Sequence, residues 1–510
     1  MLRPSLRADL ALLVALALPT SAVVLGCKKS SATEQGPVDA NFGDAPLQKQ
    51  HVDGGHRGDG GGGDAGHRVD GGGPPVDATQ MMGFDATQFR DGNIPEVNRT
   101  EVAPPPQTDY CSLPGSVVWQ NGLPSVVGGA DAGPDAGHAV DLTWMHLPDG
   151  FCSHYYATVP ETRFMRFSPS GDLFVASPGR SAAGGAVGGL SAIVVLPDDN
   201  HDGYADSTLK YMSGLVTTHG LLFYDGSLYY QNGTAFFRTP YTNGDRVASG
   251  PGQQVIDVNV YVSPDHWGKA IDVDDNGNIY VTNGGDEGES CSGAELTSNP
   301  AFHGGILRID GSPNGELIAR GLRNAYALRC AKGTGVCFGL ELARDFVPEL
   351  GSREKLFPVH LGDNWGFPCC ATANTPYSDY TNPAPDCSEV KAEEDSFTID
   401  HTPFGLDFEE GAWTGTFQYR AFVALHGYYG GWYGARVLAI ATNPTTGWPD
   451  MAVETDAGTT TMTDFATGWD DGRQDHGRPA AVTFAPDGRL FIGDDMNGVI
   501  LWVAQAKSGT

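Results

Sequence analysis

Short runs of alternating hydrophobic and polar residues recur along the chain from about residue 150 onward, each interrupted by a turn that contains glycine. Alternation with a period of two predicts half-buried β-strands, and a glycine turn between two such runs predicts a β-hairpin. Four copies are clear and two are looser. The clear copies occupy 164–177, 221–232, 270–283 and 481–495, and the looser ones occupy 322–343 and 404–427.

The spacing of these hairpins indicates a repeat. The equivalent positions Leu173, Leu228 and Ile279 follow one another at intervals of 55 and 51 residues (228 − 173 and 279 − 228). One hairpin in about 50 residues is typical of a propeller blade. Two separate sheets are the alternative, and the regular spacing disfavours them. We therefore expect an all-β fold, a six-bladed β-propeller, with long insertions at 344–400 and 428–475 on one face.

The first 27 residues carry a different pattern. Arg3 and Arg7 precede an apolar stretch at 10–25, which ends in Val-Leu-Gly and then Cys27. This order is typical of a bacterial export signal with a lipobox, in which Cys27 is lipidated. An ordinary signal peptide is the alternative. The lipobox predicts an exported protein, periplasmic or extracellular, that meets the outer membrane or cell surface only through its N-terminal lipid.

Differences in amino-acid composition divide the rest of the chain into a linker, an extension and a domain. Residues 28–105 are rich in Gly, Asp and Pro and contain almost no large apolar side chains, so they predict a disordered linker. We expect 106–150 to be an irregular N-terminal extension and 151–505 to be the propeller domain.

Charge restricts the partners. The chain has 62 acidic and 31 basic residues, a formal net charge of −31. Such a surface repels polyanions, so we expect no nucleic-acid partner. An anionic cofactor would need arginine and lysine residues concentrated in one place.

Eight cysteines remain once the lipidated one is set aside, and in an oxidising compartment they allow up to four disulfides. Cys330 and Cys337 are close enough in sequence to form a local bridge. Cys369 and Cys370 have two options: a bridge to each other, or a bridge from one of them to Cys387.

Six segments, taken in order, resemble the PQQ-dependent glucose/sorbosone dehydrogenases. The segments are LPDDNHDGYADS at 196–207, DHWGK at 265–269 with the hairpin that follows, ARGLRNAYAL at 319–328, GDNWGFP at 362–368, HTPFGLDF at 401–408 with AFVALHG at 421–427, and GRPAAVTFAPDGRLFIGDD at 477–495. Together they span about 160–503. The resemblance implies a propeller that uses pyrroloquinoline quinone (PQQ), a planar quinone with three carboxylates, and Ca²⁺. The implied reaction is hydride transfer to PQQ from a small-molecule sugar, polyol or related aldehyde, with an electron acceptor that the sequence does not name.

The resemblance also assigns catalytic roles. His266 matches the base that removes the substrate hydroxyl proton, a role that suits histidine because it titrates near neutral pH. Asp286 matches the carboxylate that orients this histidine. The alternative for Asp286 is an ordinary turn aspartate that caps a hairpin.

Cofactor contacts follow in the same way. Arg323 and Asn324 match the family's cofactor-binding pair, and Arg478 matches the first arginine of a pair in the last blade. A guanidinium suits this role because it binds a carboxylate through two parallel hydrogen bonds. Lys269 is a nearby cationic candidate. A surface salt bridge is the alternative for each of these basic residues.

Three positions depart from the family pattern. Ala480 stands where the second arginine of the last-blade pair is expected, and Ala343 stands where a glutamate is often found. Leu350, with Gly351 and Ser352, replaces the turn that precedes the family's calcium site. Main-chain carbonyls, such as that of Gly351, are the remaining candidates for that calcium.

A second calcium signal is independent of the resemblance. Oxygen-bearing side chains alternate at Asp198, Asn200, Asp202 and Asp206, with Gly203 at the sixth position. This matches the first nine positions of an EF-hand-like loop without its final glutamate. An acidic, solvated turn between strands is the alternative.

The aromatic run at 426–434 suits either stacking on a sugar or packing against a neighbouring blade. The leading hypothesis is a dehydrogenase. A non-catalytic surface scaffold, favoured by Ala343, Leu350 and Ala480, and a calcium-dependent lactonase-like hydrolase are the alternatives.

Overall fold

The computed structural model describes residues 108–128, 140–179, 191–258, 266–285, 291, 304–312, 315–344, 353–380, 383–392, 395–428, 432–450, 454, 461–470 and 476–507. These residues form β-strands and two single-turn 3₁₀ helices, η2 (Tyr110–Ser112) and η5 (Gly415–Phe417), with no α-helix among them. No helix in this part of the chain is long and apolar enough to cross a membrane.

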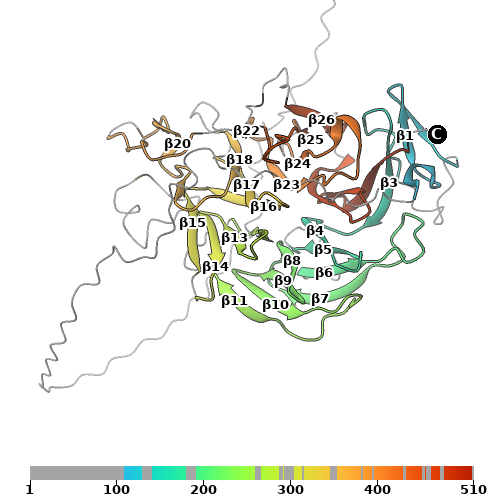
Figure 1. Cartoon of the computed structure of the whole chain (residues 1–510), viewed down its shortest axis with the longest axis horizontal. Helices are drawn as coiled ribbons and strands as arrows, with labels where there is room; N and C mark the ends of the chain where they lie inside the picture. The colour runs from blue at the N-terminus through green and yellow to red at the C-terminus, as the bar shows by residue number, and fades with distance from the viewer. Residues whose placement is uncertain are drawn as a thin grey trace, which may run out of the picture. The chain divides into compact units, whose positions relative to one another are not determined.

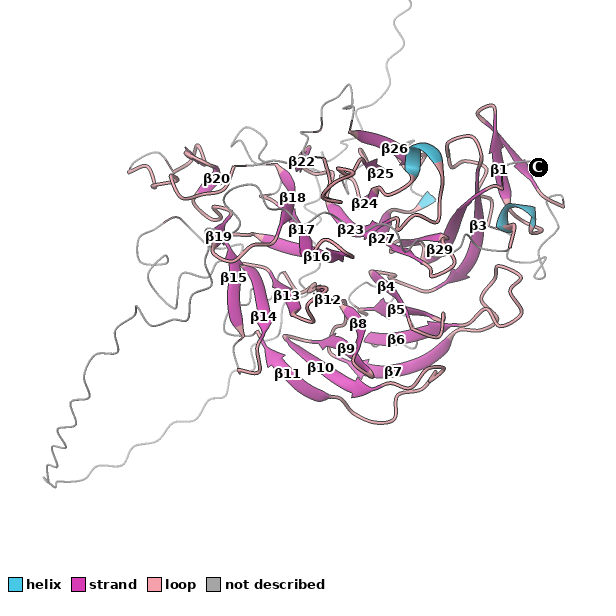
Figure 2. Ribbon diagram, viewed as in Figure 1, coloured by secondary structure: helices cyan, strands magenta, loops and turns pink. Residues whose placement is uncertain are grey.

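The strands form six antiparallel sheets that surround a common centre (Figures 1 and 2). The first sheet contains β4 (Phe164–Phe167), β5 (Leu173–Ser177), β6 (Ser191–Leu196) and β7 (Leu209–Leu215). The second contains β8 (Leu221–Tyr224), β9 (Ser227–Asn232), β10 (Ala235–Pro240) and β11 (Gln253–Asp257). The third contains β12 (Ile271–Val273), β13 (Ile279–Asn283), β14 (Gly305–Ile309) and β15 (Glu316–Arg320).

The remaining three sheets follow the same plan. The fourth contains β16 (Asn324–Ala331), β17 (Val336–Leu342), β18 (Glu354–Pro358) and β22 (Asp395–Phe397). The fifth contains β23 (Pro403–Phe408), β24 (Ala421–Leu425), β25 (Arg436–Ile440) and β26 (Met462–Ala466). The sixth contains β27 (Pro479–Phe484), β28 (Leu490–Asp494), β29 (Val499–Gln505) and β3 (Phe151–Thr158).

The first strands of the six sheets close into a ring. Each contacts the next, in the order β4, β8, β12, β16, β23, β27 and back to β4. Each hairpin predicted from the sequence forms the first two strands of one sheet. The predicted six-bladed β-propeller is therefore confirmed.

The ring is closed by strands from both ends of the domain. β3 pairs with β29 along its whole length, with Phe151 opposite Gln505 and Thr158 opposite Val499. This pairing gives the last blade its fourth strand and removes the open sheet edge that would otherwise invite association. A hairpin of β1 (Val117–Gln120) and β2 (Leu123–Val126) extends the same sheet, in a segment expected to be irregular.

The two segments that we expected to be insertions, 344–400 and 428–475, are insertions only in part. They contain β18, β22, β25 and β26, which complete two blades. These outer strands escaped sequence analysis because they lack the glycine hairpin that marks the inner pair. Between β18 and β22 the chain does leave its blade. There it adds β19 (Asp363–Asn364) in parallel to β15 and forms a small hairpin of β20 (Cys370–Thr372) and β21 (Thr375–Pro376).

The core lies between neighbouring blades. Every residue of β24 and of β28 is buried, because each sheet packs against a neighbour on both of its faces. Burial on both faces explains why the alternation in these strands is less regular than in a sheet with one face in water.

Four disulfides stabilise the domain: Cys111–Cys152, Cys291–Cys369, Cys330–Cys337 and Cys370–Cys387. The local bridge between Cys330 and Cys337 is confirmed. Of the two options for Cys369 and Cys370, the vicinal bridge is wrong, and Cys370 pairs with Cys387.

Candidate functional site

Topology gathers one set of residues on one face of the propeller. In every blade the second strand runs antiparallel to the first, so the residues just before the first strand and just after the second meet at the same end. Direct contacts between neighbouring blades show that these ends of the six blades lie on the same face of the propeller. The residues at the start of the first strands, in blade order, are Arg163, His219, His266 with Lys269, Arg323 with Asn324, His401 and Arg478.

The structure therefore places the predicted residues His266, Lys269, Arg323, Asn324 and Arg478 on this face, although more than 200 residues separate the first from the last (478 − 266). Three further predicted site residues, Cys27, Asp286 and Gly351, lie outside the described part of the chain, as does Leu350. We refer to the region where the six strand starts meet as the central rim.

His266 is buried, with 4% of its surface exposed, and is fixed by a main-chain carbonyl. Its Nδ1 lies 2.5 Å from the oxygen of Gly285, and the Gly285 N–H donates to the oxygen of Arg323 at 2.6 Å. Gly284 permits this approach, because a Cβ there would lie 2.3 Å from that of His266. When Nδ1–H donates to Gly285, Nε2 is the ring nitrogen that can take up a proton.

Lys269 is a buried amine, 1% exposed. Its Nζ donates to Oδ1 of Asn283 at 2.9 Å and to the oxygen of His266 at 3.3 Å. No carboxylate among the described residues forms an ion pair with it. Burial lowers the pKa of Lys269 to about 7. The rim thus contains a buried amine whose positive charge is partly suppressed near pH 7.

Arg323 and Asn324 lie side by side at the start of β16. The Arg323 guanidinium donates to the oxygen of Ala343 at 2.7 Å, so the residue that departs from the family pattern contributes through its main chain. Asn324 is 8% exposed, and its Oδ1 accepts no hydrogen bond from any described residue. A buried acceptor without a donor costs free energy, so Asn324 is suited to a ligand that brings one.

Arg478 is held by the blade before it. Its Nε donates to the oxygen of His426 at 2.9 Å, Nη2 donates to that of Gly427, and the guanidinium carbon lies 5.2 Å from the ring of Trp432. Ala480 is fully buried and packs with Tyr326, Leu342 and Phe404. The position where the second arginine is expected is therefore part of a small apolar cluster in this chain.

Sequence analysis missed a network that joins four blades. The Arg163 Nε lies 2.7 Å from Oδ2 of Asp495, and His426 Nε2 lies 2.8 Å from Oδ1 of the same carboxylate. Arg163 also donates to the Tyr326 hydroxyl at 3.2 Å. Burial alone would raise the pKa of Asp495, but the Arg163 guanidinium and His426 lower it, so this carboxylate stays ionised.

His219 is a second residue that was missed. It is completely buried, its Nδ1 lies 3.2 Å from the oxygen of Lys269, and its Nε2 has no hydrogen-bond partner among the described residues. Burial lowers the pKa of His219 to about 3 and that of His426 to about 3, so both rings are neutral near pH 7. A search for polar residues just before each predicted hairpin would have found Arg163 and His219.

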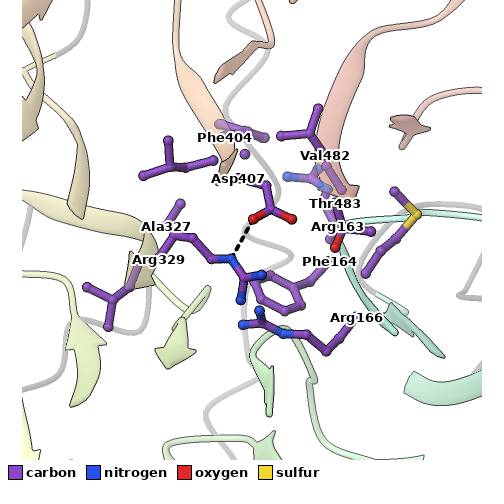
Figure 3. A pocket seen from close by; sticks show the side chains of 14 residues that line it. Arg163, Phe164, Arg166, Ala327, Arg329, Phe404, Asp407, Val482 and Thr483 are labelled. Carbon is purple, nitrogen blue, oxygen red and sulfur yellow. Dashed lines mark hydrogen bonds and ion pairs between the residues drawn. The ribbon is translucent and has the colours of Figure 1, made fainter. Parts of the chain in front are cut away.

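The channel below the rim is narrow. Figure 3 shows Arg166, Arg329 and Asp407 pointing into a pocket lined by the first strands of four blades. Arg329 pairs with Asp407 at 2.6 Å and with Asp272 at 3.2 Å, and Arg166 lies 3.4 Å from Asp272. The remaining cavity is about 20 Å³, room for a single water molecule. A molecule of the size of a sugar or a quinone does not fit into this cavity.

The side chains of the predicted calcium loop have different partners. Asp202 accepts hydrogen bonds from the Asn200 side chain and the Tyr204 N–H, and Asp206 accepts one from the Asp199 N–H at 2.6 Å. Asp198 instead faces Arg489 at 3.7 Å. Among the described residues no group of three or more His, Cys, Asp and Glu side chains is arranged to hold a metal. Asp202 and Asp206 thus close local turns, whereas both carboxylate oxygens of Asp198 are buried. A calcium ion at this loop stays a prediction.

The described residues of the aromatic run at 426–434 lie in different environments. Trp432 is buried in the cluster between the fifth and sixth blades, whereas 62% of Tyr433 is exposed. Residues 429–431 lie outside the described residues.

No protein-family model matches the chain, and no curated protein matches it in sequence. Solved structures do match in fold. The iodide structure of the Trichoderma reesei enzyme of carbohydrate-active family AA12 aligns with a TM-score of 0.58 and 19% identity, over 71% of this chain and 97% of that chain. A calcium structure of the same enzyme aligns with a TM-score of 0.58 and 17% identity, over 72% of this chain and 100% of that chain.

The holo form of the pyranose dehydrogenase PQQ domain from Coprinopsis cinerea aligns with a TM-score of 0.53 and 15% identity, over 70% of this chain and 96% of that chain. Likeness at such identities concerns the fold and not the chemistry. The resemblance predicted from the six ordered segments is thus confirmed at the level of the fold, which this chain shares with the AA12 enzyme and the pyranose dehydrogenase PQQ domain.

Proposed function

We propose that the chain is a quinoprotein dehydrogenase that oxidises a sugar, polyol or related aldehyde with PQQ as cofactor. One observation carries the proposal: the propeller brings His266, Lys269, Arg323 and Arg478 to a single rim above a channel too narrow for a ligand. A base and a set of cations on one face are what an anionic quinone and a hydroxyl substrate require. The AA12 enzyme and the pyranose dehydrogenase PQQ domain, which share the fold, support the assignment.

The rim residues fit PQQ in charge and in hydrogen bonding. Lys269 has no carboxylate partner in the described part of the chain, and Asn324 Oδ1 has no donor. Arg323 and Arg478 carry permanent charge and hydrogen-bond to main-chain oxygens. We infer that these four residues hold the cofactor carboxylates and polar edge.

When bound, PQQ supplies the carbon that accepts a hydride from the substrate. The chain supplies the proton transfer: His266 accepts the substrate hydroxyl proton at Nε2, while Gly285 holds Nδ1–H and so fixes the tautomer. The salt-bridged channel below the rim excludes bulk water from that side. Substrate therefore reaches His266 from the outer side of the rim.

Calcium has no comparable support from the described residues, which contain no suitable cluster. The turn around Gly351 lies outside them. We derive no step through calcium and leave its requirement to reconstitution with and without the ion.

The proposed location is the cell envelope. Cys27 after the apolar stretch at 10–25 would give a lipid anchor, and the four disulfides fit an oxidising compartment. The substrate is a small molecule, and the electron acceptor is left to experiment.

Reconstitution tests the proposed function. Purified protein is incubated with PQQ, with and without Ca²⁺, and reduction of an artificial dye is followed over aldoses, polyols and aldehydes. We expect turnover with at least one substrate and its loss in His266→Ala, with the circular-dichroism spectrum unchanged. Quinone binding without turnover on any substrate would favour a surface binding module, for which Ala480 is the supporting observation. Absence of quinone binding would rule out the proposed dehydrogenase function.

A further inference from the structure

A second pocket lies beside the central rim, between the fifth and sixth blades. It encloses about 280 Å³ and is bounded by the loop from β28 to β29, the segment before β27 and the residues at 140–144. This is just under the range of about 300–1,000 Å³ that is usual for drug-sized ligands. The pocket is large enough for one six-membered ring with its hydroxyl groups.

Three aromatic rings form one wall. The Trp144 indole stacks on the His476 imidazole at 4.1 Å and 9°, and it meets Trp469 edge-on at 5.3 Å. Trp469 is buried, whereas Trp144 and His476 are half-buried. Aromatic faces of this kind pack against the C–H groups of a sugar ring while its hydroxyls point elsewhere.

This wall is built into the fold. His146 and Thr467 exchange main-chain hydrogen bonds of 2.9 and 3.1 Å, which fasten the 140–147 segment to the end of the fifth blade. Met145 is completely buried in the core between the blades. Gly468 allows the segment to approach, because a Cβ there would lie 2.7 Å from the Trp144 oxygen. Trp144 is thus held in place whether or not a ligand is bound.

Polar groups lie opposite the aromatic wall. Asp141 and Asn497 stand at the exposed edge of the pocket and Asp494 at its buried end, with Ile492 and Leu501 as an apolar floor. Carboxylate and amide oxygens accept hydrogen bonds from hydroxyls. An apolar floor, an aromatic face and acceptors at both ends match a ring that is apolar on its faces and hydroxylated at its edges.

The charged residues that line the pocket restrict the class of ligand that it can bind. The described residues that line the pocket include no arginine or lysine, so none of them offers a counter-charge to an anion. Burial, together with the neighbouring Asp495, raises the pKa of Asp494 well above its usual range. A carboxyl group held neutral gives little attraction to a cation. Hydrogen bonds from Thr143 lower the pKa of the other carboxylate of the pocket, Asp141, at its exposed edge, so a quaternary ammonium is the competing ligand that the test includes.

We propose that this pocket binds an uncharged monosaccharide unit, at a site separate from the central rim. Asp494 connects the two places, since its Oδ2 accepts the main-chain N–H of Arg478 at 2.9 Å. The pocket needs neither quinone nor turnover to bind its ligand, so its failure can be distinguished from failure of the proposed dehydrogenase.

Saturation-transfer NMR on the full-length protein without quinone tests the site. The probes are glucose, galactose, mannose and xylose, with choline chloride as the cationic comparison. We expect saturable binding of at least one sugar. Trp144→Ala should weaken that binding by about tenfold or more, because it removes the stacking face.

Two further variants keep the test decisive if Trp144→Ala does not fold. Asn497→Ala changes an exposed edge residue and should weaken the same sugar severalfold. His266→Ala should leave binding unchanged, because that residue lies in the central rim. Tyr224→Ala changes an exposed aromatic residue at the end of β8. It is the matched control and should leave sugar binding unchanged.

Three outcomes would overturn the proposal. They are no saturable sugar binding in the wild-type protein, binding that survives both Trp144→Ala and Asn497→Ala, and choline binding in place of sugar binding. Loss of sugar binding in His266→Ala would assign the ligand to the central rim and would overturn it as well.

Discussion

A buried amine without a carboxylate partner is the most informative single residue of the rim. Lys269 donates only to neutral oxygens in the described structure, those of Asn283 and of the His266 main chain. Burial removes water from the Lys269 ammonium, and no neighbouring negative charge compensates for that loss. The pKa of Lys269 is therefore lowered to about 7. An anionic ligand would supply the missing charge and would draw a proton onto the amine when it binds.

This predicts a pH dependence of quinone affinity. Since Lys269 is protonated below about pH 7, PQQ should bind more tightly at pH 6 than at pH 8. Lys269→Met, which keeps the volume and removes the charge, should weaken binding and flatten that dependence. Equilibrium titration of protein fluorescence with PQQ measures both effects.

Lys332→Met is the matched control, because Lys332 is exposed and pairs only with Glu410 at 3.5 Å. It should leave the affinity and its pH profile unchanged. If Lys269→Met binds PQQ as the wild-type protein does at both pH values, Lys269 is not part of the cofactor site.

Sequence motifs located some rim residues and not others for a physical reason. His266 and Arg323 stand in recognisable runs, DHWGK and GLRN, so each could be found from its neighbours. Arg163, His219 and Asp495 are single polar residues whose partners lie in other blades. Only the closed ring of strands brings such residues together, and no local sequence pattern predicts these contacts.

At the level of elements, the closing strand β3 holds the two ends of the domain together. The Cys111–Cys152 disulfide joins the short helix η2 to this strand, across 41 residues of chain. The Cys330–Cys337 disulfide spans only 7 residues within one hairpin, β16–β17, where the strands already pair. A disulfide restricts the unfolded chain more when it closes a longer loop.

Removal of the two bridges should therefore have unequal effects. Replacement of Cys111 and Cys152 by Ala should lower the free energy of unfolding by about 2–4 kcal/mol. Replacement of Cys330 and Cys337 by Ala should lower the free energy of unfolding by a smaller amount. Urea unfolding followed by circular dichroism compares the two. Equal losses would show that closure by β3 does not depend on the longer bridge.

The sequence indicated inner strands better than outer ones. Most inner pairs are joined by a short turn, such as Asp225-Gly226 between β8 and β9, where both residues have positive φ. β18 and β22 are separated by a long excursion instead, so no hairpin signal marks them. β18 pairs with β17, and β22 pairs with β18 only after the chain returns to the blade.

For the whole molecule, neutral histidines buried at the blade junctions connect stability to pH. His219 has a pKa near 3 in the folded protein, against about 6.5 in an unfolded chain. Between these values the unfolded state binds a proton that the folded state does not, so stability falls as pH falls below about 6.5. For this one residue the loss is about 2 kcal/mol by pH 5.

We therefore expect a lower urea midpoint at pH 5 than at pH 7, and a smaller difference in His219→Phe. His146→Phe, which changes an exposed imidazole, should retain the wild-type difference. An unchanged pH difference in His219→Phe would mean that other groups set the acid sensitivity.

The central claim is that one rim holds an anionic quinone between arginines contributed by different blades. Equilibrium titration of the quinone-free protein with PQQ tests it most directly, in the wild type and in Arg323→Ala and Arg478→Ala. The account predicts one saturable site in the wild type and affinity at least about tenfold weaker in each variant. No saturable binding, or wild-type affinity in both variants, would contradict it.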